Sequence, residues 1–272
     1  MKFERTWTGN WENAFHGLRH PMESYARSDS DFGIGDCDTW LESCRNEVAY
    51  SYCPDGHEDE NWGEIDEWLA ENGELRFGKY AGEYAYIGKN DLDLAQRMIK
   101  AGTPNDKFLR QIFVSVDITA PLYWWKEMDT YKVGTTANST STMHKLASTP
   151  ITIDCFETDD YCSIKQDLNM EKEDDPNQKF IIPQDNIIEN ILIPYLENLR
   201  QKFLETKDMR YWKELIRWLP ESWLQTRTWT ANYSILRNIY HWRKNHKLTE
   251  WHSFCDYIKT LPYANELVLF EN

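Results

Sequence analysis

A stretch of alternating apolar and polar residues constrains the fold more than any other feature of this 272-residue chain. The stretch is Gln111–Thr119, and its apolar members occupy every second position: Ile112, Val114, Val116 and Ile118. Successive side chains of a β-strand point to opposite faces, so this pattern predicts a half-buried strand. The fold must therefore contain a sheet with one face on the core.

Helical spacing occurs on both sides of that strand. Upstream, Asp91–Ala101 predicts a helix that Asn90 or Asp91 is placed to cap and that Gly102 ends. The C-terminal third predicts four more helices: Ile187–Lys207 with a kink or boundary at Pro194, Met209–Leu219, Trp229–Asn245 and Leu248–Thr260. Together these elements predict an α/β (α+β) fold, in which helices flank a mixed sheet.

The charge balance narrows the class of partner. The formal net charge is −15, and an acidic chain repels DNA and RNA, so we expect no polymeric nucleic acid partner. No apolar run reaches the roughly 18 residues of a membrane span, and Met1–Asn10 lacks an apolar leader core, so we expect a cytoplasmic protein with no membrane partner.

The cysteines do not indicate a metal centre. In the cytosol the six cysteines should be reduced. The densest group has a spacing that matches no common zinc module: Cys37, Cys44, Cys53 and His57. We predict no metal site. The acidic segments 35–75 and 154–185 are typical of solvated surface excursions and not of paired catalytic carboxylates.

A hydroxyl-rich segment offers a candidate ligand site. Seven of the eleven residues in Gly134–His144 carry a hydroxyl or an amide. Such a segment is either a low-complexity loop or a loop that cradles an anion with its small donors. The sequence alone leaves both interpretations open.

A basic cluster reverses the sign of the charge in the helical third. Its members are Arg217, Arg227, Arg237, Arg243, Lys244, His246 and Lys247. On the predicted helix Trp229–Asn245, Asn232 and Arg243 lie within about 20° of each other and roughly 16 Å apart along one face. Amide and guanidinium groups in that arrangement suit an extended anionic ligand. The alternative is that these cations pair with surplus carboxylates on an exposed surface.

From Leu94 onward the chain resembles the flavin-dependent thymidylate synthases, the ThyX family. The strongest stretch is Leu219–Asn232, which ends in Thr-Trp-Thr-Ala-Asn and is followed by Asn238 six residues on and Arg243 eleven on, at the family's offsets. The signature loop is matched at Thr136, Asn138 and Ser141. The family's three loop arginines, its histidine and its glutamate are absent.

The resemblance implies a ThyX-like subunit in a homotetramer that uses FAD and dUMP. It implies that Arg243 holds the pyrimidine as the catalytic residue, that Ser141 contacts the nucleotide phosphate, and that Asn232 and Asn238 lie at the flavin. Arg217 is carried over as a further nucleotide-binding residue, although it is one residue out of register. The remaining assignments are Thr136 and Asn138 at the cofactor, and Lys132 and His144 at the nucleotide.

The resemblance also sets the expected domain plan. We expect a single ThyX-like domain over 1–272, with an N-terminal extension, 1–90, and an acidic insertion, 154–185.

Three functions follow as hypotheses. The first is flavin-dependent methylation or another modification of a pyrimidine nucleotide. The second is a non-catalytic homologue that binds or sequesters a nucleotide, as a phage or defence protein would. Arginines are lost at Tyr131, Val133 and Met143, and each charge-assisted contact contributes about 1.5–3 kcal/mol. Either the ligand therefore differs from dUMP and FAD, or the protein kept a nucleotide pocket and lost the redox chemistry. The third is a structural oligomer whose functional surface would include Trp7, Trp11 and Phe15.

Overall fold

The computed structural model describes residues 1–35, 76–77, 82–141, 146–159, 170–172, 175–180 and 187–271. The chain forms two compact units. Unit 1 comprises Met1–Ile118, Tyr131–Asn138 and Arg227–Asn272, and unit 2 comprises Thr119–Thr130 and Ser139–Thr226. The expectation of one domain with an extension and an insertion stays a prediction.

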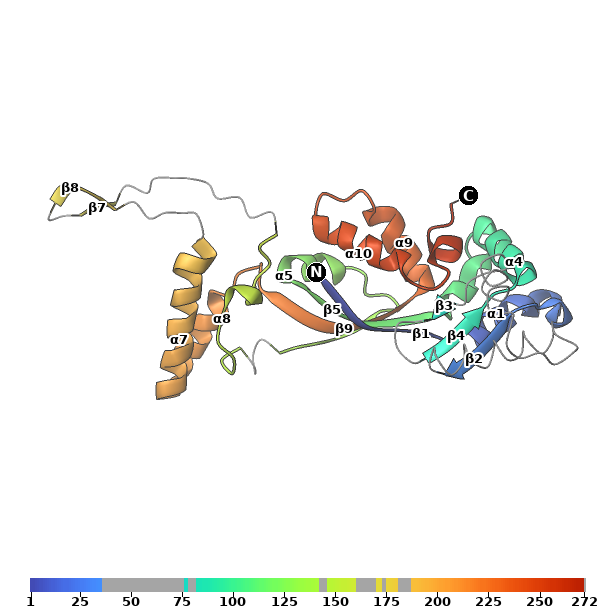
Figure 1. Ribbon diagram of the computed structural model, residues 1–272, viewed down its shortest axis with the longest axis horizontal. Helices are drawn as coiled ribbons and strands as arrows, with labels where there is room; N and C mark the ends of the chain where they lie inside the picture. The colour runs from blue at the N-terminus through green and yellow to red at the C-terminus, as the bar shows by residue number, and fades with distance from the viewer. Residues whose placement is uncertain are drawn as a thin grey trace, which may run out of the picture. The chain divides into compact units, whose positions relative to one another are not determined.

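Unit 1 contains most of the strands and the two C-terminal helices (Figure 1). Its elements are β1 (Lys2–Gly9), α1 (Trp11–Arg19), β2 (Asp31–Gly35), β3 (Arg76–Phe77), β4 (Gly82–Tyr86), α4 (Lys89–Ala101), most of β5 (Phe113–Pro121), most of β6 (Thr136–Ser139), the end of β9 (Leu224–Asn232), α9 (Tyr233–Arg243) and α10 (Thr249–Lys259). Short helical turns cover His20–Met22, Tyr25–Arg27, Asn105–Arg110 and Ala264–Val268.

Unit 2 is built mainly from helices. Its elements are α5 (Leu122–Met128), a short turn at Ile153–Cys155, β7 (Met170–Lys172), β8 (Asp175–Phe180), a π-helical turn at Ile188–Leu192, α7 (Ile193–Thr206) and α8 (Met209–Arg217). α7 and α8 lie side by side (Figure 1). Their core is a cluster of aliphatic and aromatic side chains: Leu146, Ile151, Phe156, Leu196, Leu199 and Leu215.

The main sheet is a four-stranded antiparallel sheet in the order β1-β5-β9-β6. The sequence prediction for its second strand is confirmed, because Val114, Val116 and Ile118 of β5 are all buried. A smaller sheet has the order β2-β4-β3, with Asp31 opposite Tyr86. The predicted mixed α/β (α+β) fold class is confirmed.

One predicted helix begins later than expected. The stretch Trp229–Asn232 belongs to strand β9, and α9 begins only at Tyr233. The β-branched and aromatic residues before Asn232 favour a strand over a helix. Asn232 is therefore the N-cap of α9, in extended conformation, and its placement on one helical face with Arg243 was wrong.

The aromatic N-terminus is part of the core. Trp11 and Phe15 of α1 are buried, and Trp11 meets Tyr233 edge-on with 5.2 Å between ring centroids. A Trp or Phe ring buried in this way contributes packing and is withdrawn from partners. The hypothesis that Trp11 and Phe15 form a functional surface is therefore wrong.

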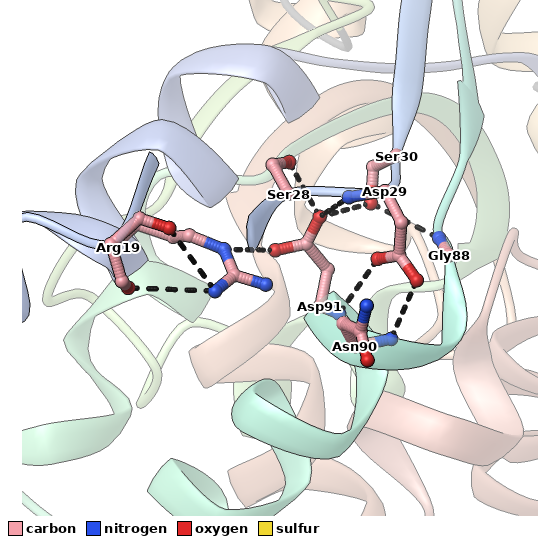
Figure 2. A network of polar contacts seen from close by, with 8 residues as sticks. Arg19, Ser28, Asp29, Ser30, Gly88, Asn90 and Asp91 are labelled. Carbon is pink, nitrogen blue, oxygen red and sulfur yellow. Dashed lines mark hydrogen bonds and ion pairs between the residues drawn. The ribbon is translucent and has the colours of Figure 1, made fainter. Parts of the chain in front are cut away.

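A buried ionic network fixes the start of α4 (Figure 2). Arg19 Nε donates to Asp91 Oδ1 at 2.6 Å, and Ser28 and Ser30 hydroxyls donate to Asp91 Oδ2 at 2.7 and 2.6 Å. Burial raises the pKa of the Asp91 carboxyl, but the hydrogen bonds from Ser28, Ser30 and Arg19 outweigh burial and hold the pKa below its ordinary value. Asp91 is thus the centre of a scaffold contact.

The same network supplies the cap of α4. Asp29 accepts hydrogen bonds from the backbone N–H groups of Asn90 and Asp91, at 2.8 and 3.1 Å. The prediction that Asn90 or Asp91 caps the helix was wrong. The helix begins at Lys89, after Gly88, so both residues lie inside its first turn. The cap comes from a residue some sixty positions earlier in the chain.

Within the described ranges, every helix falls short of the length and hydrophobicity that a membrane crossing requires. In the same ranges no set of three or more His, Cys, Asp or Glu side chains is arranged to hold a metal ion. The cysteine group around Cys37, Cys44, Cys53 and His57 lies outside the described residues. The cytoplasmic location stays a prediction.

Candidate functional site

The candidate site in unit 1 is centred on Arg243, at the end of α9. The Arg243 guanidinium lies over the Trp251 ring, 4.5 Å from its centroid, and 5.6 Å from the centroid of Tyr131. Its Nε donates a hydrogen bond to Tyr131 Oη at 2.9 Å. Each such cation–π contact contributes about 0.5–2 kcal/mol. The two aromatic residues therefore fix the orientation of a guanidinium that is only partly buried.

The loop Tyr131–Ser139, which contains the start of the hydroxyl-rich segment, approaches both ends of α9. Tyr131 contacts Arg243 at the C-terminal end of the helix. A methyl group built on Gly134 would lie 3.0 Å from Ile235 Cδ1 and 3.7 Å from Asn232 Nδ2, so the loop backbone passes close to the N-terminal end. Gly134 has a φ of 75°, a conformation that favours glycine. The loop and the helix thus form one surface.

Asn232 begins that surface and has a structural role of its own. Its Oδ1 accepts a hydrogen bond from the backbone N–H of Ile235 at 3.1 Å, which caps α9. The side chain is buried at the point where the loop approaches. One asparagine therefore joins β9, α9 and the loop.

The other unit 1 residues of the predicted site are exposed. Lys132 lies on the loop, Thr136 and Asn138 lie on β6, and Asn238 lies on α9. Strand β6 neighbours β9, the strand that leads into α9. At 100° per residue, Asn238 and Arg243 are about 140° apart around the helix, so they present different faces. A single ligand that contacts both residues would have to bend around α9. Otherwise Asn238 and Arg243 would contact two separate ligands or two separate groups of one ligand.

The rest of the predicted set lies elsewhere. Ser141 and Arg217 belong to unit 2, where Arg217 is exposed and forms an ion pair with Glu214 at 2.8 Å. His144 lies outside the described residues, as does Met143. The assignments of all the predicted site residues stay predictions.

Much of the basic cluster is occupied in structural contacts. Arg237 Nη1 donates to the backbone carbonyls of Val268 and Phe270, and Lys244 forms an ion pair with Glu271. Burial lowers the pKa of Arg237 from its ordinary value. The alternative interpretation of the cluster, pairing with carboxylates, is therefore correct for Arg217 and Lys244.

Sequence reasoning missed the two aromatic residues that hold Arg243. Tyr131 stands where the family has an arginine, so the sequence indicates only that a positive charge is missing there. Trp251 lies eight residues after Arg243 and on the next helix, α10, where it is fully buried. No local spacing rule pairs residues on two different helices, so only the packing of α10 against α9 reveals the contact.

Comparison with known proteins agrees with this architecture. A crystal structure of thymidylate synthase X (ThyX) from Helicobacter pylori with FAD and dUMP is similar to the chain, with a TM-score of 0.52 and 14% sequence identity. The match covers 98% of this chain and 97% of that one. A second structure of the same enzyme has a TM-score of 0.46 at 14% identity, covering 88% of this chain and 95% of that one.

The first of these likenesses establishes the fold. The chain has a ThyX-like fold. No protein-family model and no curated protein sequence matches the chain.

Proposed function

We propose that the chain binds a pyrimidine nucleotide and FAD at the surface formed by α9 and the loop Tyr131–Ser139, and that it modifies the nucleotide as a thymidylate synthase-like methyltransferase. The observation that carries this proposal is the contact of the loop with both ends of α9, within a chain that has the ThyX-like fold. The similar enzyme was crystallised with FAD and dUMP.

Arg243 is the residue we assign to the pyrimidine and to catalysis. Its planar guanidinium carries a permanent positive charge and paired N–H donors that suit a carbonyl edge or a phosphate. Trp251 and Tyr131 hold it in one orientation, so little side-chain freedom remains to be lost when a ligand binds. Lys132 is assigned to the nucleotide phosphate.

The side chains of the surface fit a flavin. Asn238, Asn138 and Thr136 are exposed and offer amide and hydroxyl groups that match the carbonyl and N–H edge of an isoalloxazine ring. Asn232 Nδ2, buried beside the loop, is a further amide donor next to these exposed groups. When bound, FAD would supply the redox chemistry, and the protein would supply placement and electrostatics.

Three further residues are proposed from the family resemblance. Ser141 and Arg217 are assigned to the nucleotide, and His144 is assigned to offset part of the missing loop arginines. For Arg217 this requires that its exposed pair with Glu214 opens, which costs little because exposed pairs contribute only about 0–1 kcal/mol.

A second candidate function is a nucleotide-binding homologue without flavin chemistry. Val133 replaces one of the signature arginines and is 91% exposed, and Tyr131 replaces another and serves to hold Arg243. Two anion-binding groups are thereby removed from the loop. A protein that sequesters a nucleotide needs the Arg243 surface but does not need those arginines.

Binding and turnover distinguish the two candidates. The purified protein would be titrated with FAD and with dUMP by calorimetry, and its absorbance would be recorded for a flavin spectrum. The enzyme predicts binding of both ligands and rescue of a thymidine-requiring host. The sequestering protein predicts nucleotide binding without rescue. Absence of binding to FAD, dUMP and a wider nucleotide panel would exclude both.

Assembly as a homotetramer or another homo-oligomer is part of the proposal. Unit 2 exposes a group of large apolar side chains: Ile187, Ile191, Tyr195 and Trp218. The first three recur every fourth residue, so they share one helical face. Exposed apolar faces of this kind support self-association. Light scattering that finds a monomer at micromolar concentration would contradict it.

A further inference from the structure

Trp242 is the most exposed tryptophan among the described residues, with 75% of its surface accessible. Tryptophan is highly buried on average, so an indole that faces solvent on a well-formed helix calls for an explanation. Trp242 precedes Arg243 in α9 and lies about 100° around the helix from it.

Trp242 belongs to an outward stripe of α9. Ile235, Asn238 and Trp242 follow one another at intervals of three and four residues, which places them within about 60° around the helix. The loop covers the first member of the stripe, because Gly134 approaches Ile235. Asn238 and Trp242 continue the stripe and are exposed.

The exposed end of the stripe combines three kinds of chemistry. The Trp242 indole offers a flat apolar face, and the Asn238 amide one turn away offers a donor and an acceptor. Lys132 lies on the loop next to Tyr131, which is bound to the adjacent Arg243, and it adds a positive charge nearby. An aromatic face, an amide and a cation together suit a planar heteroaromatic ring that carries an anionic tail.

We propose that Trp242 is the stacking surface for such a ring. This inference rests on the proposed function and deepens it, because it names the group that would recognise the flat part of the ligand. The ring is either the isoalloxazine of FAD or the pyrimidine of the nucleotide, and separate titrations distinguish them. Stacking on an aromatic side chain removes the contacting face of each ring from water and tolerates either ring.

The test compares Trp242→Ala, Trp242→Phe and a control, Met22→Ala. Met22 is similarly exposed, at 77%, and lies in unit 1 outside α9. Each protein would be titrated with FAD and with dUMP by calorimetry, and flavin fluorescence would be followed in the FAD titration. Loss of one base–aromatic stack weakens binding by roughly 5- to 150-fold.

We expect Trp242→Ala to weaken the binding of one of the two ligands by that factor. Trp242→Phe should retain most of the affinity for that ligand, and Met22→Ala should bind both ligands as wild type does. If the ring is the flavin, its fluorescence is quenched on the wild-type protein and recovers in Trp242→Ala. If the ring is the pyrimidine, only the dUMP affinity falls.

Equal affinity of wild type and Trp242→Ala for both ligands would overturn the stacking role and leave the proposed function standing. If Trp242→Ala formed a smaller assembly in light scattering and kept both affinities, Trp242 would contact a second copy of the chain. That result would also overturn the stacking role. A wild-type protein that binds neither ligand would contradict the proposed function and this inference together.

Discussion

Two arginines of unit 1 join segments that are distant in sequence, and their surroundings differ. Arg19 is 5% exposed and donates to the fully buried carboxylate of Asp91. Arg243 is partly exposed and lies between the aromatic rings of Tyr131 and Trp251. The first contact satisfies a buried charge, whereas the second orients a charge at the surface.

The difference indicates which arginine serves the scaffold and which serves recognition. A buried ion pair with converging hydroxyl donors stabilises one arrangement of the chain, and removal of one partner leaves an unpaired buried charge. A guanidinium that ring faces orient at the surface carries a planar fork of N–H donors, which suits an anion or a carbonyl edge. Substitutions at the two positions should therefore separate stability from binding.

Asp91→Ala should have the largest effect, a loss of about 3–5 kcal/mol in the free energy of unfolding, because Arg19 would remain buried without its partner. Urea unfolding followed by circular dichroism measures this loss. The matched control is Asp93→Ala on the same helix, whose exposed pair with Arg97 should contribute less than about 1 kcal/mol. Similar losses for the two variants would contradict a scaffold role for Asp91.

Arg243→Ala should weaken nucleotide binding by roughly 10- to 150-fold, the equivalent of one charge-assisted hydrogen bond of about 1.5–3 kcal/mol. Calorimetry against dUMP measures it. Arg243→Lys should recover only part of the affinity, because lysine lacks the planar fork. Arg97→Ala removes an exposed arginine of α4 and should leave the affinity unchanged; a comparable loss there would indicate that only net charge matters.

Asn232 allows the cap and the ligand contact to be separated. Asn232→Ala removes the cap of α9 and should cost about 0.5–2 kcal/mol in stability, whereas Asn232→Asp keeps the accepting oxygen and should cost little. Both variants lack the amide donor, so both should bind FAD less tightly. Asp208→Ala removes the cap of α8 and serves as the control, with lower stability and unchanged affinity. If the FAD affinities of these three variants fell in proportion to their losses of stability, a direct contact between Asn232 and FAD would be ruled out.

Gly134→Ala should have the smallest effect on binding. Its positive φ makes any side chain cost about 1–2 kcal/mol, and the added methyl group would press on Ile235 Cδ1. The loop should shift from α9 and reduce dUMP affinity severalfold. Gly102→Ala also introduces a side chain at positive φ, but in open space, so it should lower the melting temperature without a change in affinity.

Local patterns predicted the elements of the fold better than its long-range contacts. The alternation in β5 and the helical spacing of α4, α8 and α10 identified these elements because each pattern lies within one element. The boundary between β9 and α9 was missed although the β-branched and aromatic residues before Asn232 favour a strand, because strand propensity depends strongly on context. Strand pairing decided the matter, and pairing depends on residues far away in the chain.

The candidate site shows the same division. The offsets from Asn232 to Asn238 and Arg243 could be found from the sequence, since they lie within one short stretch. The contacts of Arg243 with Tyr131 and Trp251 could not, because they join a loop and two helices. The Arg19–Asp91 pair spans 72 positions and left no local signal either.

Hydrogen exchange with and without FAD and dUMP tests the central claim, that recognition belongs to the Arg243 surface and not to the Asp91 network. We predict slower exchange in peptides that cover Tyr131–Ser139 and α9 when the ligands are added, and unchanged exchange in the first turn of α4. If the ligands slowed exchange elsewhere in the chain but left the exchange of both the loop and α9 unchanged, the account would be contradicted.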